Sequence, residues 1–140
     1  MIIADTSGLL ALFNRNEPLN AEAADAVERR NELLVVSPFV LAELDYLTAT
    51  RLGIAAELSI LRELAGGAYE LAMIAPADVE TCADIVEQYR DQKIGVADAS
   101  LVVLAQRYHT RTILTLDHRH FSVLRPRDGG RFVLLPSRPS

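Results

Sequence analysis

Short apolar runs recur along the chain and predict strands that are buried on both faces. These runs lack the polar residue at every second position that marks a half-exposed strand, and this is typical of a parallel sheet covered by helices. We expect strands at residues 2–4, 33–36, 69–74, 112–116 and 132–135.

Helical patterns fill the segments between the predicted strands, with apolar residues recurring at three- and four-residue spacing. We expect helices at residues 9–13, 21–30, 38–52, 54–64, 76–89 and 95–108. Ser37 followed by Pro38 is a typical helix start, and Gly66 marks a helix end. Strands alternating with helices predict an α/β sandwich around a parallel sheet, and the length fits a single domain over residues 1–140.

Composition limits the location and chemistry of the protein. Half of the residues are hydrophobic, which is enough for a core without disulfides or a structural metal. The single cysteine, Cys82, excludes an intramolecular disulfide and a cysteine-based zinc cluster. No apolar stretch approaches the roughly 20 residues of a membrane helix, and Asp5 interrupts the first apolar run. We therefore expect a cytoplasmic protein with no signal peptide and no membrane span.

Charge is distributed unevenly along the chain. The formal net charge of -5 argues against a protein that binds nucleic acid through bulk positive charge. Residues 107–140 nevertheless contain seven arginines and only two acids. The arginines are Arg107, Arg111, Arg119, Arg125, Arg127, Arg131 and Arg138. This asymmetry is compatible with an acidic metal site beside a basic phosphate-binding rim, although an unevenly charged surface is the more common cause.

Two acids stand directly after predicted strands. Asp5 follows the first strand, and Asp117 follows the fourth. Ligands of open parallel sheets bind beyond the carboxyl ends of the strands, so these acids are placed to meet despite their separation in sequence. Each also has an ordinary alternative as a turn or helix-capping residue.

Two further acids lie in predicted helices. Glu43 has large apolar neighbours three and four positions away, and a carboxylate on such a face is costly unless something pairs with it. These neighbours are Phe39, Val40, Tyr46 and Leu47. Asp45 is expected to be a solvated flank residue of the same helix. Asp98 precedes the apolar run 101–105, where its alternative role is an N-terminal helix cap.

A set of carboxylates without cysteine or repeated histidine favours Mg²⁺ or Mn²⁺ over zinc. Such a site is suited to phosphodiester hydrolysis, because the ion polarises the phosphate and activates a bound water. Two other classes of phosphate chemistry fit poorly. A phosphoaspartate enzyme needs a lysine at a late strand end, whereas the chain has only Lys93. A nucleoside triphosphatase needs a glycine-rich phosphate loop, which is absent from the sequence.

In four blocks the sequence resembles the PIN-domain family and, within it, the VapC-type toxins. The blocks are Asp5-Thr6-Ser7, residues 38–44 with Glu43, residues 96–99 with Asp98, and Thr115-Leu116-Asp117 followed by His118-Arg119-His120-Phe121. Their order and separation are more specific than any single block. The resemblance implies a PIN-like three-layer α/β/α sandwich with a parallel sheet of four to five strands.

The same resemblance implies a site and an activity. The metal-binding and catalytic carboxylates would be Asp5, Glu43, Asp98 and Asp117, with Mg²⁺ as cofactor and Mn²⁺ as a substitute. The substrate-binding residues would be Thr6, Ser7, Thr115, His118 and Arg119. Family members often carry a further acid or amide shortly after the fourth block, whereas His118, Arg119 and His120 stand here, so a second metal ion is less assured.

The activity implied is that of a Mg²⁺-dependent endoribonuclease that hydrolyses RNA phosphodiester bonds as the toxin of a toxin-antitoxin pair. Its partners would be the RNA substrate, a small VapB-like antitoxin protein and a second copy of the chain in a homodimer. The alternative that the sequence leaves open is a catalytically silent PIN-like module that binds RNA or protein.

Overall fold

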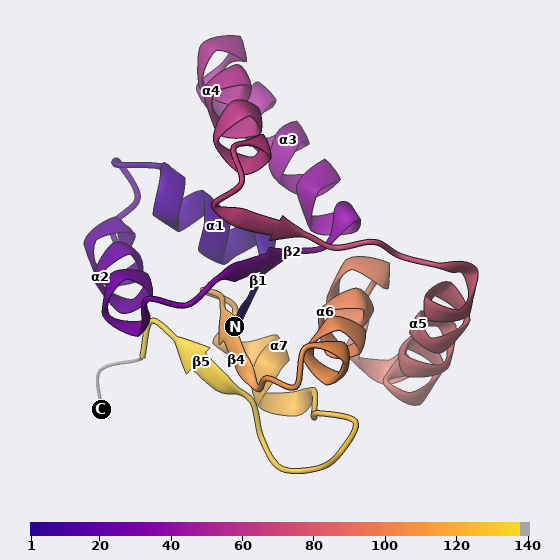
Figure 1. Ribbon diagram of the computed structural model, residues 1–140. Coiled ribbons are helices and arrows are strands. Elements are labelled where there is room, and N and C mark those ends of the chain that lie inside the picture. Colours follow the sequence, from indigo (N-terminus) through magenta and orange to yellow (C-terminus); the bar gives the residue numbers. More distant parts are fainter. Residues whose placement is uncertain (138–140) are drawn as a thin grey trace.

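The computed structural model describes residues 1–137 and contains one sheet of five parallel strands (Figure 1). The strands are β1 (Ile2–Ala4), β2 (Leu34–Val36), β3 (Tyr69–Leu71), β4 (Thr112–Leu114) and β5 (Val133–Leu135). Their order across the sheet is β3-β2-β1-β4-β5, and every neighbouring pair is parallel. The expected parallel sheet is confirmed, but β3 and β4 end earlier than predicted, at Leu71 and Leu114.

Helices connect the strands and cover both faces of the sheet. They are α1 (Thr6–Phe13), α2 (Asn20–Arg30), α3 (Pro38–Leu52), α4 (Ile54–Ala65), α5 (Pro76–Gln88), α6 (Val96–Arg107), α7 (His118–Val123) and the short 3₁₀ helix η1 (Arg90–Gln92). The six predicted helices are present, whereas α7 and η1 were not expected. The chain runs from β1 outward to β3, then crosses to β4 and β5 on the other side. Right-handed crossovers in these two directions place helices on opposite faces, which gives the three-layer sandwich.

The ends of α3 follow from its sequence. The hydroxyl of Ser37 accepts a hydrogen bond from the backbone N–H of Phe39 at 3.2 Å, and Pro38 occupies the first turn. The same hydroxyl bonds that of Ser100 on α6 at 2.7 Å. Gly53, with a φ of +92°, lets the chain turn directly from α3 into α4. The cap therefore also ties α3 to α6 across the core.

The core is centred on β1 and the helices against it. Ile2, Ile3 and Ala4 are fully buried, because β1 has a strand on each side and helices on both faces. Gly8 brings α1 into close contact with β4, since a Cβ added there would lie only 2.6 Å from the carbonyl carbon of Leu114. The missing side chain at Gly8 thus sets the distance between α1 and β4.

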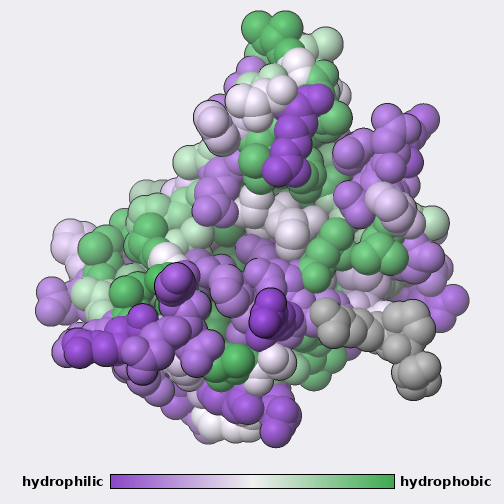
Figure 2. Space-filling model, turned by 180° about the vertical axis from the view of Figure 1, so that it is seen from behind, coloured by the Kyte–Doolittle hydropathy of each residue, from purple (hydrophilic) through white to green (hydrophobic). Residues whose placement is uncertain are grey.

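Helices α3 and α4 form a hairpin that stands away from the sheet (Figure 1). Hydrophobic residues are visible on it as green atoms at the top of Figure 2. Its exposed large apolar side chains are Tyr46, Leu52, Ile54 and Leu58. They do not mark a membrane span, because within residues 1–137 no helix has the length and hydropathy to cross a bilayer.

Asp45, which was expected to be solvated, lies between the two helices of this hairpin. Its Oδ1 atom is buried and accepts no hydrogen bond from the described residues. Hydrogen bonding with Asp45 raises the pKa of Glu57 on α4 above its ordinary value. The expectation was wrong because α4 folds back over this flank of α3, a packing that the sequence pattern does not specify.

Candidate active site

A cavity of about 510 Å³ lies at the carboxyl ends of the central strands. Its lining residues are Asp5, Thr6, Ser7, Leu10, Glu43, Tyr46, Leu47, Arg51, Asp98, Asp117 and His120. All four acids singled out in the sequence are among them. The cavity lies beyond β1 and β4, the pair at which the direction of chain progression across the sheet changes. Such a switch point is where open parallel sheets bind ligands.

Asp5 is the most buried of these acids, with only 7% of its surface exposed. It caps α1, since its Oδ1 accepts a hydrogen bond from the Thr6 N–H at 2.8 Å. Its Oδ2 accepts hydrogen bonds from the hydroxyls of Thr115 at 2.8 Å and Ser7 at 3.2 Å. Burial, with a smaller contribution from the charge of Asp98, nevertheless raises the pKa of Asp5 to about 6. The capping role and a functional role therefore coexist at Asp5.

Thr115 and Ser7 connect the end of β1 to the segment after β4. The Ser7 hydroxyl accepts a hydrogen bond from the N–H of Leu116 at 2.9 Å, and the Thr115 hydroxyl accepts one from the N–H of Asp117 at 2.9 Å. Thr115 is completely buried and is absent from the cavity lining. Its predicted contact with substrate is therefore replaced by a contact with Asp5, which it orients.

Glu43 reaches the cavity from α3. The hydroxyl of Thr6 donates a hydrogen bond to its Oε1 at 2.6 Å, which joins this helix to the end of β1. Glu43 is an exposed residue, so the expected costly burial among apolar neighbours does not occur. Of those neighbours, Val40 is buried, whereas Tyr46 is exposed and itself lines the cavity. The carboxylate thus lies on the side of α3 that faces the opening.

Asp98 lies in the first turn of α6 and does not cap it. The N-cap is Gly95, whose N–H donates a hydrogen bond to the Asp98 carboxylate. Burial, together with the charges of Glu43 and Asp117, raises the pKa of Asp98, while His120 and Gly95 oppose this shift. The alternative prediction, that Asp98 is the helix cap, was therefore wrong, because the cap lies three positions earlier. The Asp98 side chain nevertheless bonds the start of the helix.

Asp117 lies three residues beyond the end of β4, because that strand is shorter than expected. It caps α7, with Oδ1 accepting a hydrogen bond from the N–H of His120 at 3.1 Å. His120 Nδ1 lies 3.0 Å from Asp117 Oδ2 and 3.8 Å from Asp98 Oδ2. His120 is thus a site residue that the sequence reasoning missed. Its spacing is the signal that could have found it. If Asp117 is taken as a helix cap, His120 stands three residues further on, at a distance that brings the two side chains together.

Within residues 107–137, no arginine of the arginine-rich segment lines this cavity. Arg107 pairs with Asp78 at 2.7 Å and Arg111 with Asp128 at 3.4 Å, while Arg138 lies outside the described residues. His118 and Arg119, in the first turn of α7, are not among the residues lining the cavity. The basic side chains that do line it are Arg51 and His120, neither of which was selected from the sequence.

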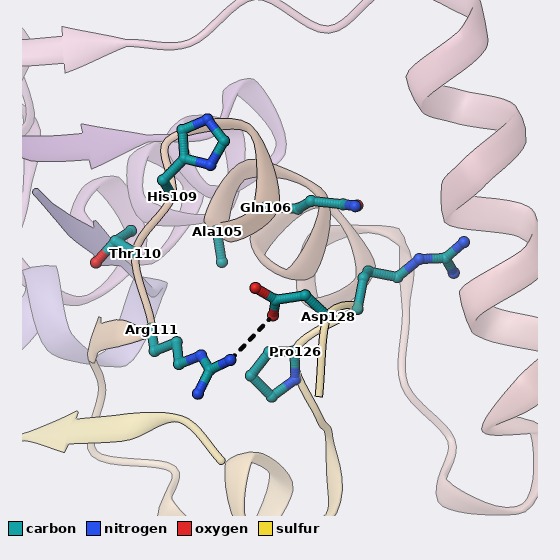
Figure 3. Close-up of a pocket in the computed structure, with 8 residues that line it drawn as sticks. Ala105, Gln106, His109, Thr110, Arg111, Pro126 and Asp128 are labelled. Atoms are coloured by element: carbon teal, nitrogen blue, oxygen red, sulfur yellow. Dashed lines mark hydrogen bonds and ion pairs between the residues drawn. The ribbon is translucent and has the colours of Figure 1, made fainter. Parts of the chain in front are cut away.

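A second cavity, of about 350 Å³, contains the Arg111–Asp128 pair (Figure 3). It is also lined by His109 and Thr110, which precede β4. It therefore lies at the amino end of this strand, away from the four acids. We accordingly assign the candidate active site to the cavity at the carboxyl ends of the strands.

Within residues 1–137, no three acidic, histidine or cysteine side chains meet in a ready-made metal shell. The expectation that four acids converge on one metal-sized point is therefore met only in part: they share one cavity and act on one another electrostatically. Like charges repel, so carboxylates without a cation between them are expected to stand apart.

Comparisons with known proteins identify the fold and the family. A family model described as the PIN domain matches residues 2–125. Ribonuclease VapC26 of Mycobacterium tuberculosis is 59% identical over 135 residues, which cover 96% of this chain and all of that protein. The crystal structure of Mycobacterium tuberculosis VapC20, described as a sarcin-ricin loop cleaving toxin, superposes with a TM-score of 0.77 at 17% identity. This match covers 84% of this chain and 90% of the other. The chain therefore belongs to the PIN-domain family and, within it, to the VapC proteins.

Proposed function

We propose that the protein is a divalent-metal-dependent endoribonuclease that hydrolyses RNA phosphodiester bonds. The observation that carries this proposal is the cavity in which Asp5, Glu43, Asp98 and Asp117 come together from four separate parts of the chain. The 59% identity to a protein named as a ribonuclease supports it. Because RNA is the substrate, we place the activity in the cytoplasm.

The residues present fit a hard divalent cation. Asp5 is a buried carboxylate that pairs with no cation among residues 1–137, and burial raises its pKa to about 6. The candidate ligands are the carboxylate oxygens of Asp5, Glu43, Asp98 and Asp117, which suit Mg²⁺, or Mn²⁺ in its place. When bound, the ion would polarise the phosphate, activate a water molecule and stabilise the leaving oxygen.

The chain's own groups set the geometry around that ion. Thr115 and Ser7 hold Asp5 through its Oδ2, and Thr6 holds Glu43. We propose that Thr6 and Ser7, which line the cavity, also contact the phosphate. A carboxylate not engaged by metal can hold the attacking water and accept its proton, and the exposed Glu43 is suited to this role. Any contact that His118 and Arg119 make with RNA lies outside the cavity.

Removal of divalent metal is expected to abolish RNA cleavage, and addition of Mg²⁺ or Mn²⁺ is expected to restore it. Cleavage is measured on total RNA by gel and by sequencing the new ends, in excess EDTA and after dialysis into either metal. Because the ion would relieve repulsion among the acids, Mg²⁺ should also raise the melting temperature of the wild-type protein. Undiminished cleavage in EDTA would refute the metal-dependent mechanism. Absence of cleavage in every metal, with RNA binding retained, would favour the silent binding module.

We propose that the protein acts as a toxin, as a homodimer bound to a small antitoxin protein. The exposed apolar side chains of the α3–α4 hairpin support this, because Ile54 is 70% exposed and Leu58 is 40% exposed. Such a surface is typical of a protein interface. The uncompensated carboxylates of the cavity would attract an arginine or lysine of the partner.

Light scattering is expected to give a dimer for the protein alone and a larger complex when the product of the neighbouring reading frame is co-expressed. Ile54→Asp should weaken assembly, because it places a charge in the proposed interface. Met73→Asp is the matched control, since Met73 is 82% exposed and lies outside the hairpin. A wild-type monomer that co-purifies with no small protein and is not toxic when expressed alone would overturn this assignment.

A further inference from the structure

The cavity has a second half that the carboxylate chemistry does not use. This half is lined by Leu10 of α1 and by Tyr46, Leu47 and Arg51 of α3. Counting from Glu43 on α3, these three residues stand three, four and eight positions further on, so all share one helix face. The face extends about 12 Å from the carboxylate toward the end of the helix.

Tyr46 presents an aromatic ring at this face. It is 68% exposed, which is unusual for so large an apolar surface beside a cavity. The ring contacts recorded among residues 1–137 join Phe13 to Tyr69 and Phe121 to Phe132, and Tyr46 takes part in neither. Its ring is therefore available to a flat partner from outside the chain.

Arg51 lies one turn beyond Tyr46 and Leu47. It is exposed, and none of the ion pairs within residues 1–137 includes it, although carboxylates line the same cavity. A cation in the last turn of a helix complements the helix dipole. This explains why a basic residue stands at this position, but not why its side chain lines the cavity. A guanidinium here is positioned to meet an anion that enters beside the carboxylates.

We infer that the half-cavity formed by Leu10, Tyr46, Leu47 and Arg51 binds one unpaired nucleotide of the RNA next to the bond that is cut. Tyr46 stacks on the base, Leu10 and Leu47 provide the apolar floor, and Arg51 pairs with a flanking phosphate. The inference rests on the proposed nuclease function, because that function places the phosphate next to this nucleotide at the carboxylates.

Three features favour single-stranded RNA as the occupant. The base half and the carboxylates belong to one continuous cavity, whose volume of about 510 Å³ is within the usual range of ligand sites. An aromatic ring beside an arginine suits a base followed by a phosphate. A paired base is stacked within its duplex and offers no free face to Tyr46, so the site selects against double-stranded RNA.

Binding is tested with a fluorescein-labelled single-stranded oligoribonucleotide, measured by anisotropy in Mg²⁺ with Asp98→Asn as the parent protein to prevent cutting. Tyr46→Ala and Arg51→Ala are each expected to weaken binding about tenfold, and Tyr46→Phe to stay within about twofold of the parent. Met73→Ala and Arg62→Ala, exposed residues outside the cavity, are the matched controls and should bind as the parent does. In the cleaving protein, Tyr46→Ala should raise KM about tenfold with little change in kcat.

Scanning the oligonucleotide with single abasic positions identifies the stacked base. At one position, loss of the base should weaken binding to the parent about tenfold but to Tyr46→Ala less than about twofold. Unchanged binding by Tyr46→Ala, or additive losses at every position, would overturn the base site while leaving the nuclease assignment intact. Loss of assembly in light scattering with unaltered RNA binding would also overturn it and identify Tyr46 as a protein contact. If the parent shows the expected losses in binding but the wild-type protein cuts no RNA, the nuclease function fails, and with it the place of the nucleotide beside a cut bond, while the nucleotide-binding role of the half-cavity stands.

Discussion

Replacing Asp98 with asparagine is expected to lower RNA cleavage at least about a thousandfold, which corresponds to about 4 kcal/mol in activation free energy. Asp98 interacts electrostatically with Asp5, Glu43 and Asp117, so it lies among all the other acids of the cavity. Asparagine keeps the size and one oxygen but removes the charge that a cation requires. Initial rates on one RNA, at saturating Mg²⁺, measure the loss.

Asp84→Asn is the matched control for this substitution. Asp84 is an exposed acid on α5 and does not line the cavity, so its replacement should leave the rate within about twofold of wild type. The Asp98→Asn protein should retain a cooperative melting transition. Full activity in this variant would mean that Asp98 has no part in the reaction.

Asp5→Asn should also abolish cleavage, and its stability tests the state of the buried carboxyl. Burial raises the folded-state pKa of Asp5 to about 6, above the ordinary value of about 3.9. The ionised group therefore opposes folding: the cost is absent below about pH 4, grows between about pH 4 and 6, and is complete above that range at about 3 kcal/mol. In chelator, Asp5→Asn should melt several degrees above wild type near pH 7.5 and at a similar temperature near pH 4. A lower melting temperature near pH 7.5 would show that the carboxylate is stabilising.

Gly8→Ala is expected to lower the free energy of unfolding by about 3 kcal/mol or more, which is a large fraction of the stability of a domain of this size. The added Cβ would overlap the carbonyl group of Leu114, and neither backbone can move without separating α1 from β4. Urea unfolding followed by circular dichroism measures the change.

Gly95→Ala is the matched control for the backbone effect. Gly95 is also a glycine at the start of a helix, but a Cβ there meets no atom within 4 Å, and its φ of -106° suits alanine. Its cost should stay below about 1 kcal/mol. Equal losses in the two variants would mean that the contact with β4 does not explain the effect of Gly8→Ala, since helix propensity favours alanine over glycine.

The sheet, its six main helices and the gathering of the four acids were all predictable from the sequence. The predictions succeeded where pattern and position agree, as at Ser37 and Pro38, or where an acid follows a fully apolar strand, as at Asp5. The predictions failed where a local sequence pattern does not specify what packs against a helix face. Glu43 has apolar neighbours on its helix, but the sequence does not say that Tyr46 among them is exposed.

The end of β4 shows why His120 was missed. Thr115 and Leu116 have the composition of strand residues, yet β4 ends at Leu114, and the Thr115 hydroxyl bonds Asp5 and the N–H of Asp117. The contact with Asp5 depends on a residue 110 positions away in the sequence. The six residues of α7 are also too few to show helical periodicity, so the helix that carries His120 gave no signal of its own.

The central position of β1 has a consequence for how the protein is made. Strand β1 is translated before the other four strands of the sheet, so one of its two edges is paired only when β4 follows, and the Oδ2 of Asp5 is held only when Thr115 follows, 110 residues later. Gly8 likewise has no surface to pack against until Leu114 is in place. A nascent chain therefore carries an incomplete cavity for most of its synthesis.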